Sequence, residues 1–478
     1  MIFSSSIFLF AFFPIFFIVL FCMRNHIHFQ NAWIIFGSLL FYTWGARQFV
    51  LVVLGTLFID YLLGHLIYTH EKYTKLFVCI DVTMNVGILL YFKYLNFFID
   101  NINAIFANIG WNPIVYTKIM LPLGVSFVIF QKMTYCLDIA KKSVVPTRNF
   151  FNLMEYLLIF PQIVAGPIVK YNEISSQIKQ RQITQEMFLY GFKRFSVGLF
   201  KKVWIADVVA EMADSVFGAQ AIAPVPFDYA WIGIIAYTFQ IYFDFSGYSD
   251  MAIGMLSMMG FRIGENFNMP YAATGIVDFW KRWHISMTSW FREYLYFPLG
   301  GNRKGVFRTY LNKWIVFLVS GFWHGASWNF VFWGAYHGTM ICAESIILPS
   351  RPQESHRNVS RIFRCIGTFF IVMTGWIFFR ADTLRTAFSY LINMYDFSSY
   401  YLHIKPQFIL NIDPLGWSML VLAALICFFP LFAKTYNWLQ VKAAKHSNLC
   451  YAGVLILFVL SSLKVITGTE SPFIYFSF

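Results

Sequence analysis

Two histidines in apolar, aromatic surroundings are the residues of this sequence best placed to do chemistry. His324 lies in the run Ser320-Gly-Phe-Trp-His-Gly-Ala-Ser-Trp-Asn329, and His284 ends the run Phe279-Trp-Lys-Arg-Trp-His284. An imidazole at lipid depth is costly unless it is hydrogen-bonded or faces a water-lined cavity, so such a residue is a functional candidate. A basic, glycine-broken segment, residues 292–313, lies between them. The pattern indicates two buried imidazoles joined by a cationic patch.

His324 has the chemistry of a general base. A neutral buried imidazole can accept the proton of a hydroxyl group, and Gly325 directly after it allows close approach of backbone or substrate. His337 lies 13 residues further on, which on a continuous helix means about 20 Å of rise and a face about 140° away. On such a helix the two histidines cannot share a reaction centre. We therefore expect His337 to be a hydrogen-bonded packing residue.

The densest cationic cluster of the chain surrounds and follows His284. Its members are Lys281, Arg282, Arg292, Arg303, Lys304, Arg308 and Lys313. They have two interpretations. They belong to a cytoplasmic loop that follows the positive-inside rule, or they form a phosphate-binding site in which arginine side chains make bidentate hydrogen bonds to the phosphate. The glycine-containing turn Phe297–Gly305 would add backbone amides that face an anion.

Composition indicates a polytopic membrane protein. The 478 residues are 58% hydrophobic and only 12% charged, whereas a soluble chain carries about 25% charged residues. The net charge of +13 is dispersed between apolar runs, which favours topology signals over nucleic-acid binding. The seven cysteines are scattered without metal-ligand spacing, so neither a disulfide framework nor a metal site is expected.

Long apolar runs predict an all-α fold, organised as a single membrane-embedded domain over residues 1–478. Membrane spans are expected near residues 1–21, 32–44, 48–68, 76–99, 119–139, 229–260, 365–380, 415–433 and 449–463. Polar segments such as 100–112 and 350–364 are expected to separate them, and 188–202 and 384–395 read as amphipathic. Basic residues after the first span and before the last one predict that both termini face outward.

Two features inside these apolar runs are unusual. Residues 156–168 are broken by Pro161, Gly166 and Pro167, which indicates either a re-entrant element or a kinked helix end. Asp244 lies within the expected span 229–260 and must face the interior of the helix bundle, where it is expected to act as a buried hydrogen-bond node.

Four stretches taken together resemble the membrane-bound O-acyltransferases, in the branch that acetylates alginate and peptidoglycan. They are Tyr242–Asp250, Asp278–Ser289, Tyr294–Lys304 and Gly321–Gly338. The resemblance implies that His324 is the membrane-embedded catalytic histidine and His284 the second active-site histidine. It also implies about eleven spans around a tunnel, with interfacial and re-entrant helices, in the inner membrane of a bacterium. The implied donor is cytoplasmic acetyl-CoA, and the implied receiver is an extracytoplasmic partner of the SGNH-hydrolase type that modifies a polysaccharide.

The expected reaction is therefore acyl transfer without a permanently bound cofactor. The phosphates of CoA are expected on Lys281, Arg282, Arg292, Arg303 and Lys304, with His324 as the base. His284 would orient the thioester or stabilise the developing oxyanion. The alternative from another class is a secondary transporter or a lipid-linked sugar flippase with a proton relay of His and Asp, which would predict inverted repeats, and none is visible.

The C-terminal tail, residues 471–478, has two interpretations that stay open. Its aromatic residues suit an anchor in the outer headgroup layer. Similar tyrosine-containing tails in the family that this chain resembles are implicated in carrying acyl groups. In that second interpretation Tyr475 accepts the acetyl group and presents it to the extracytoplasmic partner.

Overall fold

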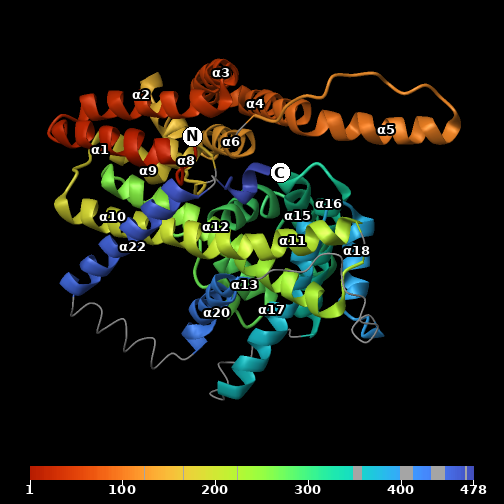
Figure 1. The fold of residues 1–478 in the computed structure, drawn as a ribbon. Helices are drawn as coiled ribbons and strands as arrows, with labels where there is room; N and C mark the ends of the chain where they lie inside the picture. The colour runs from red at the N-terminus through yellow and green to blue at the C-terminus, as the bar shows by residue number, and fades with distance from the viewer. Residues whose placement is uncertain are drawn as a thin grey trace. The chain divides into compact units, whose positions relative to one another are not determined.

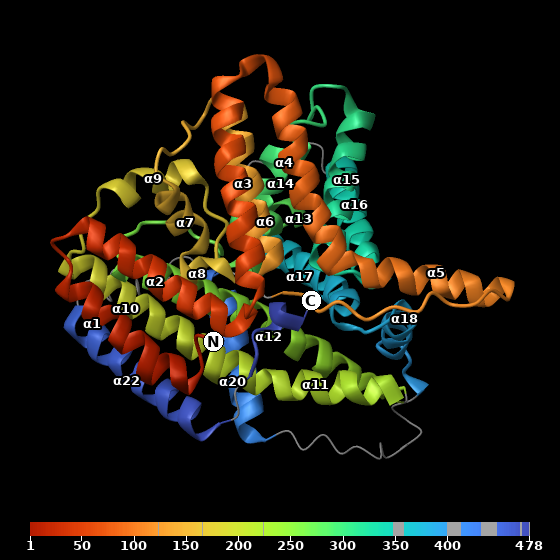
Figure 2. The same ribbon diagram turned by 90° about the horizontal axis from the view of Figure 1, so that it is seen from above.

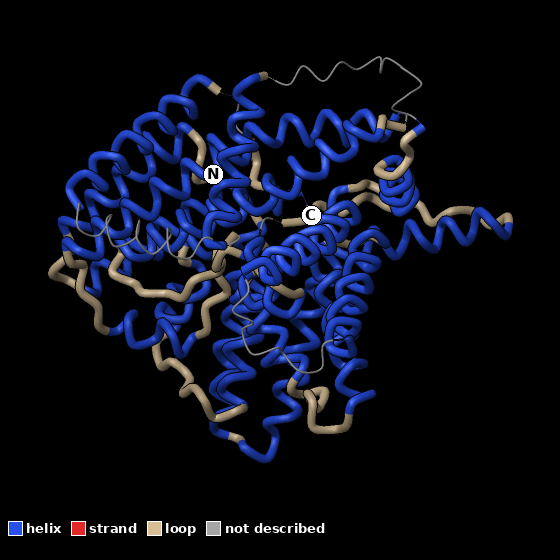
Figure 3. Tube along the Cα trace, turned by 90° about the horizontal axis from the view of Figure 1, so that it is seen from below, coloured by secondary structure: helices blue, strands red, loops and turns tan. Residues whose placement is uncertain are grey.

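The computed structural model describes residues 1–122, 124–164, 166–222, 224–347, 358–398, 413–431, 447–468 and 471–477. All regular secondary structure in these residues is helical (Figures 1 and 3). The chain divides into two compact units. Unit 1 contains residues 1–195, 248–264 and 475–477, and unit 2 contains residues 196–247 and 265–474. Whether they act as the single domain expected from the sequence stays a prediction.

Unit 1 is built from the N-terminal helices. They are η1 (Phe8–Phe12), α1 (Phe13–Cys22), α2 (Ile27–Ala46), α3 (Phe49–Thr69), η2 (Glu71–Tyr73), α4 (Thr74–Leu89), η3 (Leu90–Tyr94), α5 (Leu95–Ile109), α6 (Val125–Ala140), α7 (Phe150–Leu158), α8 (Phe160–Ile163), α9 (Tyr171–Lys179) and the greater part of α10 (Gln185–Phe200). Its core is aromatic: the Phe160 ring lies 5.2 Å from Phe12, 5.1 Å from Phe16 and 5.3 Å from Phe41.

The prediction of a polar break between helices at residues 100–112 is wrong for most of these residues. Helices α4, η3 and α5 follow one another without a gap from Thr74 to Ile109 (Figure 2). One asparagine of this segment bonds along the helix, since the Asn101 amide donates to the Phe97 carbonyl at 2.7 Å. The helix ends only at Gly110, whose φ of 76° lies in the left-handed region that glycine tolerates.

The proline- and glycine-broken segment near residue 160 is a buried interruption of helix. Ile159 leaves the helical region with ψ 114°, a single turn of α8 follows, and the described residues from 159 to 169 are all buried. The Tyr156 hydroxyl closes the interruption by donating to the Val169 carbonyl at 2.9 Å. Protein groups therefore satisfy this non-helical backbone, as both sequence interpretations require.

Unit 2 carries the remaining helices. They are η4 (Lys201–Ala206), α11 (Asp207–Ile222), the first part of α12 (Phe227–Met258), η5 (Pro270–Ala272), α13 (Ile276–Arg282), α14 (Ile285–Phe291), η6 (Arg292–Tyr296), α15 (Val306–His324), α16 (Trp328–Ile347), α17 (Asn358–Arg380), α18 (Leu384–Asn393), α20 (Pro414–Phe428), η7 (Phe429–Leu431) and α22 (Ser447–Thr467); η8 (Ile474–Ser477) begins here. The amphipathic segment expected near 384–395 is α18. The loop expected at 350–364 ends earlier, because α17 already begins at Asn358.

Five helical segments of the described residues are long and apolar enough to cross a membrane. They are Phe49–Thr69, Glu71–Ile109, Ser360–Arg380, Pro414–Leu431 and Cys450–Thr467. The shorter apolar helix Phe8–Cys22 begins inside the first expected span. The number of about eleven spans stays a prediction. The basic residues that placed the C-terminus outside, Lys442, Lys445 and His446, lie outside the described residues.

Candidate active site

His324 is the last residue of α15, and α16 begins after residues 325–327. The two helices run side by side (Figure 2) because glycines line their contact. A Cβ at Gly321 would collide with the carbonyl oxygen of Phe330, and one at Gly334 would collide with that of Phe317. Small residues permit such close helix contacts in membrane proteins. The glycines of this stretch therefore fix the position of His324.

The helix breaks after His324, so the separation from His337 that a continuous helix would impose does not apply. Because the chain reverses, the Trp333 ring lies 5.0 Å from the His324 ring and 4.9 Å from the His337 ring. The two imidazoles thus pack on the same indole. Phe379 also contacts His324, at 5.3 Å between ring centroids, and His324 is only 4% exposed.

His337 is a packing residue, as expected, but without the expected hydrogen bond. It is fully buried, and its ring lies 5.1 Å from that of Trp280. Neither of its nitrogens has a hydrogen-bond partner among the described residues, and the same holds for the indole nitrogens of Trp280 and Trp333. Buried polar groups are nearly always paired in native proteins, so these three rings offer hydrogen-bonding capacity to a polar ligand.

His284 is held in an uncommon backbone conformation by Asn266. With φ 44° and ψ 56° it occupies the left-handed region just before α14, which is unusual for a residue other than glycine. The backbone amide of Ile285 donates to the Asn266 carbonyl at 2.9 Å. The side-chain oxygen of Asn266 lies 3.1 Å from His284 Nδ1 and accepts from Ser286 N at 3.3 Å and Ser286 Oγ at 2.9 Å. Backbone and side chain of Asn266 thus clamp the turn that carries the imidazole.

These contacts set the protonation of His284. Because the Asn266 oxygen is an acceptor, Nδ1 carries the ring proton and Nε2 presents its lone pair. The residue lies outside the five candidate spans, and complete burial lowers the pKa of its imidazole to about 3. His284 is therefore neutral near pH 7. In this tautomer Nε2 is a hydrogen-bond acceptor and cannot donate to an oxyanion.

Aromatic rings connect the surroundings of the two histidines within unit 2. The Trp376 ring lies 4.9 Å from that of Trp283, which precedes His284, and 6.2 Å from that of Trp333, which contacts His324. Phe245 of α12 meets the His284 ring edge-on at 4.7 Å. Both imidazoles thus belong to one buried aromatic cluster, which excludes water from the groups that could do chemistry.

The basic residues differ in how free they are to bind a phosphate. Lys281, Arg292, Arg303 and Lys304 are exposed. Arg282 is half-buried, and its Nε lies 2.9 Å from the carboxylate of Asp278 one helical turn earlier. The exposed four remain candidates for phosphate contacts, whereas the charge of Arg282 is already compensated.

Three backbone amides of the glycine-containing turn already have partners within the protein. The backbone amides of Gly300, Gly301 and Arg303 donate to carbonyl oxygens of residues 296–300. The buried side chain of Asn312 holds the turn from α15, donating to the carbonyls of Leu299 at 3.3 Å and Gly301 at 2.9 Å. Side chains, and not these three amides, must carry any anion binding here.

Comparison with known proteins assigns the chain to a family. The model of the membrane-bound O-acyltransferase family matches residues 125–384, which include both histidines and the basic segment. The chain belongs to this family. It is therefore an O-acyltransferase and a multi-pass membrane protein, not the transporter or flippase considered as the alternative. Among its relatives, the probable alginate O-acetylase AlgI of Pseudomonas putida is 38% identical over the full length of both chains. A peptidoglycan O-acetyltransferase of Helicobacter pylori is 31% identical over all of this chain and 98% of the relative.

A more distant relative is the teichoic acid D-alanyltransferase of Bacillus subtilis. It is 25% identical over 60% of this chain and 79% of the relative. The names of these relatives refer to different acyl groups and different polymers. The acceptor therefore varies among the relatives of this acyltransferase.

The C-terminal segment of the acyltransferase is held by a buried ion cluster. Lys202 Nζ lies 2.7 Å from Asp244 Oδ1 and 2.8 Å from Asp207 Oδ1. The same ammonium group donates to Ser471 Oγ at 3.4 Å and to the Pro472 carbonyl at 3.2 Å. Asp244 faces the bundle interior as expected. Lys202, expected on an amphipathic basic helix, is buried because two carboxylates compensate its charge.

Further contacts place the residues just before Tyr475. The backbone amide of Ile474 donates to Asp244 Oδ2 at 2.7 Å. Phe473 is 1% exposed, and its ring lies 5.6 Å from Phe245, the residue that meets His284. Phe473 is therefore buried in protein, which differs from the lipid-facing position that an aromatic anchor would take. Tyr475 itself is half-buried and belongs to unit 1.

Sequence reasoning missed three parts of this arrangement. Asn266 lies in a polar loop with no motif to mark it, and Asn312 lies at the end of the basic segment 292–313, where the charged residues drew attention away from it. The contact of Lys202 with the tail joins residues 269 and 270 positions apart, which no local pattern reports. Only Lys202 and Asp244 carried a signal, because charged side chains in apolar helices need a partner.

Proposed function

We propose that this acyltransferase moves acetyl groups from cytoplasmic acetyl-CoA across the bacterial inner membrane for the O-acetylation of an extracytoplasmic polysaccharide. The polymer is an alginate-like exopolysaccharide or peptidoglycan. The observation that carries the proposal is the similarity over the full length of this chain to relatives named for these two acetylations. Both termini face outward in this proposal, and a partner of the SGNH-hydrolase type receives the acetyl group there.

His324 is the general base of the proposed reaction and Tyr475 the first acceptor. The phenol of Tyr475 gives its proton to His324 as its oxygen attacks the carbonyl carbon of the thioester. The carbon–sulfur bond then breaks, and the leaving thiolate takes the proton from the imidazolium. The products are free CoA thiol and an acetyl ester on Tyr475, with His324 neutral again.

The second half of the proposed reaction passes the acetyl group to the partner. A hydroxyl group of the partner attacks the aryl ester, and the phenolate of Tyr475 recovers a proton from that hydroxyl. A phenol, with a pKa of about 10, is a better leaving group than an alkoxide, so an aryl ester suits a relay. The contacts of Phe473 and Ile474 support this role, because they hold the chain next to Tyr475 against α12, the helix that also contacts His284.

His284 positions a reactant in this mechanism. Of the two roles expected from the sequence, the Asn266 contact favours orientation of the substrate over stabilisation of an oxyanion, because Nε2 is the acceptor side of the ring. It can accept a hydrogen bond from a hydroxyl or from an amide of the pantetheine arm.

The exposed basic residues are proposed to bind the phosphates of CoA. Lys281, Arg292, Arg303 and Lys304 are exposed and can each contact a phosphate without first breaking an internal ion pair. The unpaired ring nitrogens of Trp280, Trp333 and His337 are further candidates for contacts with the polar arm of the donor.

The experiment that tests the proposal follows the acetyl group in purified protein. Wild-type protein in detergent is incubated with acetyl-CoA in the absence of the partner, digested, and analysed by peptide mass spectrometry. We expect acetyl on Tyr475 in the wild type, and none in Tyr475→Phe or His324→Ala. Tyr451→Phe, which removes an exposed hydroxyl from α22, is the matched control and should acetylate normally.

The same variants decide the proposal in cells that contain the partner. Normal polysaccharide acetylation by the Tyr475→Phe variant would show that Tyr475 does not carry the acetyl group. Acetylation by His324→Ala at a rate near that of the wild type would show that His324 is structural and that the mechanism is wrong.

A further inference from the structure

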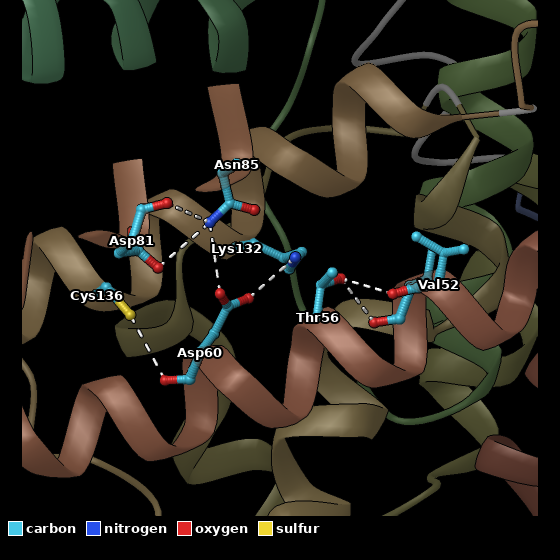
Figure 4. Close-up of polar contacts among 8 residues, drawn as sticks. Val52, Thr56, Asp60, Asp81, Asn85, Lys132 and Cys136 are labelled. Carbon is cyan, nitrogen blue, oxygen red and sulfur yellow. Dashed lines mark hydrogen bonds and ion pairs between the residues drawn. The ribbon is translucent and has the colours of Figure 1, made fainter. Parts of the chain in front are cut away.

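Unit 1 contains a second buried ionisable cluster, whose residues belong to none of the sequence motifs that mark the active site. Asp60 lies near the middle of α3, Asp81 and Asn85 lie on α4, and Lys132 and Cys136 lie on α6 (Figure 4). Each of the five is at most 1% exposed. Because α3 and α4 belong to two candidate membrane spans, the cluster lies at the depth where ionisable groups are most costly.

Direct contacts connect the members of the cluster. Lys132 Nζ lies 3.2 Å from Asp60 Oδ2. The Asn85 amide lies 3.4 Å from Asp60 Oδ1, 3.3 Å from Asp81 Oδ1 and 3.0 Å from the Asp81 carbonyl. The Cys136 thiol donates to the Asp60 carbonyl at 3.6 Å. The two carboxyl groups thus face each other across a single amide, as Figure 4 shows.

The charges of this cluster do not balance. Two carboxylates face one ammonium group, so full ionisation would leave one uncompensated negative charge. Asp81 Oδ2 is buried and accepts no hydrogen bond from the residues that the structure describes. Such an orphaned carboxylate oxygen is expensive in a low-dielectric interior. A proton on one carboxyl removes the excess charge and provides a donor between the two groups.

Other charged groups on the elements packed against α4 do not supply the missing positive charge. Lys142 pairs at 2.7 Å with Glu71 of η2, and both are exposed. Lys93 of η3 donates to Ser126 at 3.5 Å. The titratable groups that act on Asp81 are Asp60, Cys136 and Lys132. A metal ion is disfavoured as the counter-charge, because it would lie beside the Lys132 ammonium.

We propose that Asp60 and Asp81 form an intramembrane proton-binding site, in which the two carboxyl groups share one proton and Lys132 balances the remaining negative charge. The ligand is a proton taken from water, and binding converts one carboxylate into a carboxylic acid. Its release would restore an uncompensated charge between α3, α4 and α6, so proton occupancy is coupled to the packing of these helices. This inference is independent of the proposed function.

Infrared spectroscopy of the purified protein tests the site directly. A protonated carboxyl gives a carbonyl stretching band that a carboxylate lacks. We expect the band in the wild type at pH 7, its loss in Asp81→Asn, where Asp60 and Lys132 balance one to one, and about twice its area in Lys132→Met, where both acids must be neutral. The wild-type band should decrease as the pH is raised.

Asp250 provides the matched control. It is also buried in unit 1, but its carboxylate lies 2.7 Å from the guanidinium group of Arg194, so Asp250→Asn should leave the band unchanged. Absence of the band in the wild type, or its persistence in Asp81→Asn, would overturn the proposal. A band that disappears on adding sodium at constant pH would also overturn it, since the ligand would then be a metal cation.

A second measurement covers the case in which Asp81→Asn does not fold. A hydrophobic carbodiimide reacts with protonated carboxyl groups, so wild-type protein should be labelled on the peptide that carries Asp60 or Asp81. The labelling should decrease as pH rises. Labelling of Asp250 with none on these two residues would contradict the site.

Discussion

Replacing Asn266 with alanine should slow acetyl transfer without weakening the binding of acetyl-CoA. The side-chain oxygen of Asn266 is the acceptor that fixes His284 Nδ1, and it also binds both the amide and the hydroxyl of Ser286. Asn266 has no contact with the donor in the proposed mechanism. Its effect must therefore pass through the orientation and tautomer of His284.

The contacts set the size of the effect. A buried hydrogen-bond donor left without an acceptor costs about 1–3 kcal/mol. If this loss falls on the imidazole in the transition state, the barrier rises by the same amount, and kcat falls by about 5- to 150-fold. The KM for acetyl-CoA should stay near the wild-type value, because a positioning contact is lost and not a binding contact.

The assay follows acetyl transfer from acetyl-CoA through Tyr475 to the partner, so that the enzyme turns over and kcat and KM can be measured separately. Ser286→Ala is the matched control, because it removes one hydrogen bond to Asn266 and leaves the His284 contact in place. It should lose some thermal stability but keep kcat. His284→Ala sets the lower limit of the rate. A wild-type kcat in Asn266→Ala, or equal losses in Asn266→Ala and Ser286→Ala, would refute the positioning role of Asn266.

The helical membrane character of the fold could be predicted from the sequence, because long apolar runs have few other solutions in a bilayer. The positions at which helices begin and end were harder to predict from the sequence. Residues 100–109 continue a helix because their polar side chains can bond along it, and the reversal after His324 depends on the close glycine contacts of α15 and α16. Both outcomes are decided by packing between segments, which a local pattern does not report.

The candidate residues of the site could be proposed from the sequence, but their arrangement in space could not. His284 and His324 stood out because imidazoles are rare in apolar runs. Asp60, Asp81 and Lys132 carry the same signal, yet their mutual pairing depends on the register of three helices. The contact of Lys202 with the tail depends on where the chain end lies in space. The sequence thus identifies ionisable residues in apolar segments, but only the structure shows which of them pair and balance each other's charge.

Three further predictions concern packing, charge and pH. Gly321→Ala should lower the melting temperature by the overpacking cost of about 1–3 kcal/mol, whereas Gly367→Ala, which has open space around the added methyl, should not; equal melting temperatures would contradict the close-contact argument. Neutralising Arg303 and Lys304 together should raise the KM for acetyl-CoA by about 2- to 30-fold, as two exposed contacts of about 0.2–1 kcal/mol each imply, and should flatten its dependence on salt; an unchanged KM would return both residues to topology signals. The last prediction follows from the pKa of His284, which burial lowers to about 3. Below a pH of about 6.5 the imidazole of His284 is protonated in the unfolded chain but stays neutral in the folded chain. The contribution of His284 to the free energy of unfolding is therefore fully present above that pH, and it falls by about 1.4 kcal/mol per pH unit as the pH decreases toward 3. Thermal melts from pH 7 to pH 5 should therefore fall more steeply for the wild type than for His284→Gln, and parallel curves would show that this imidazole is not held neutral by burial.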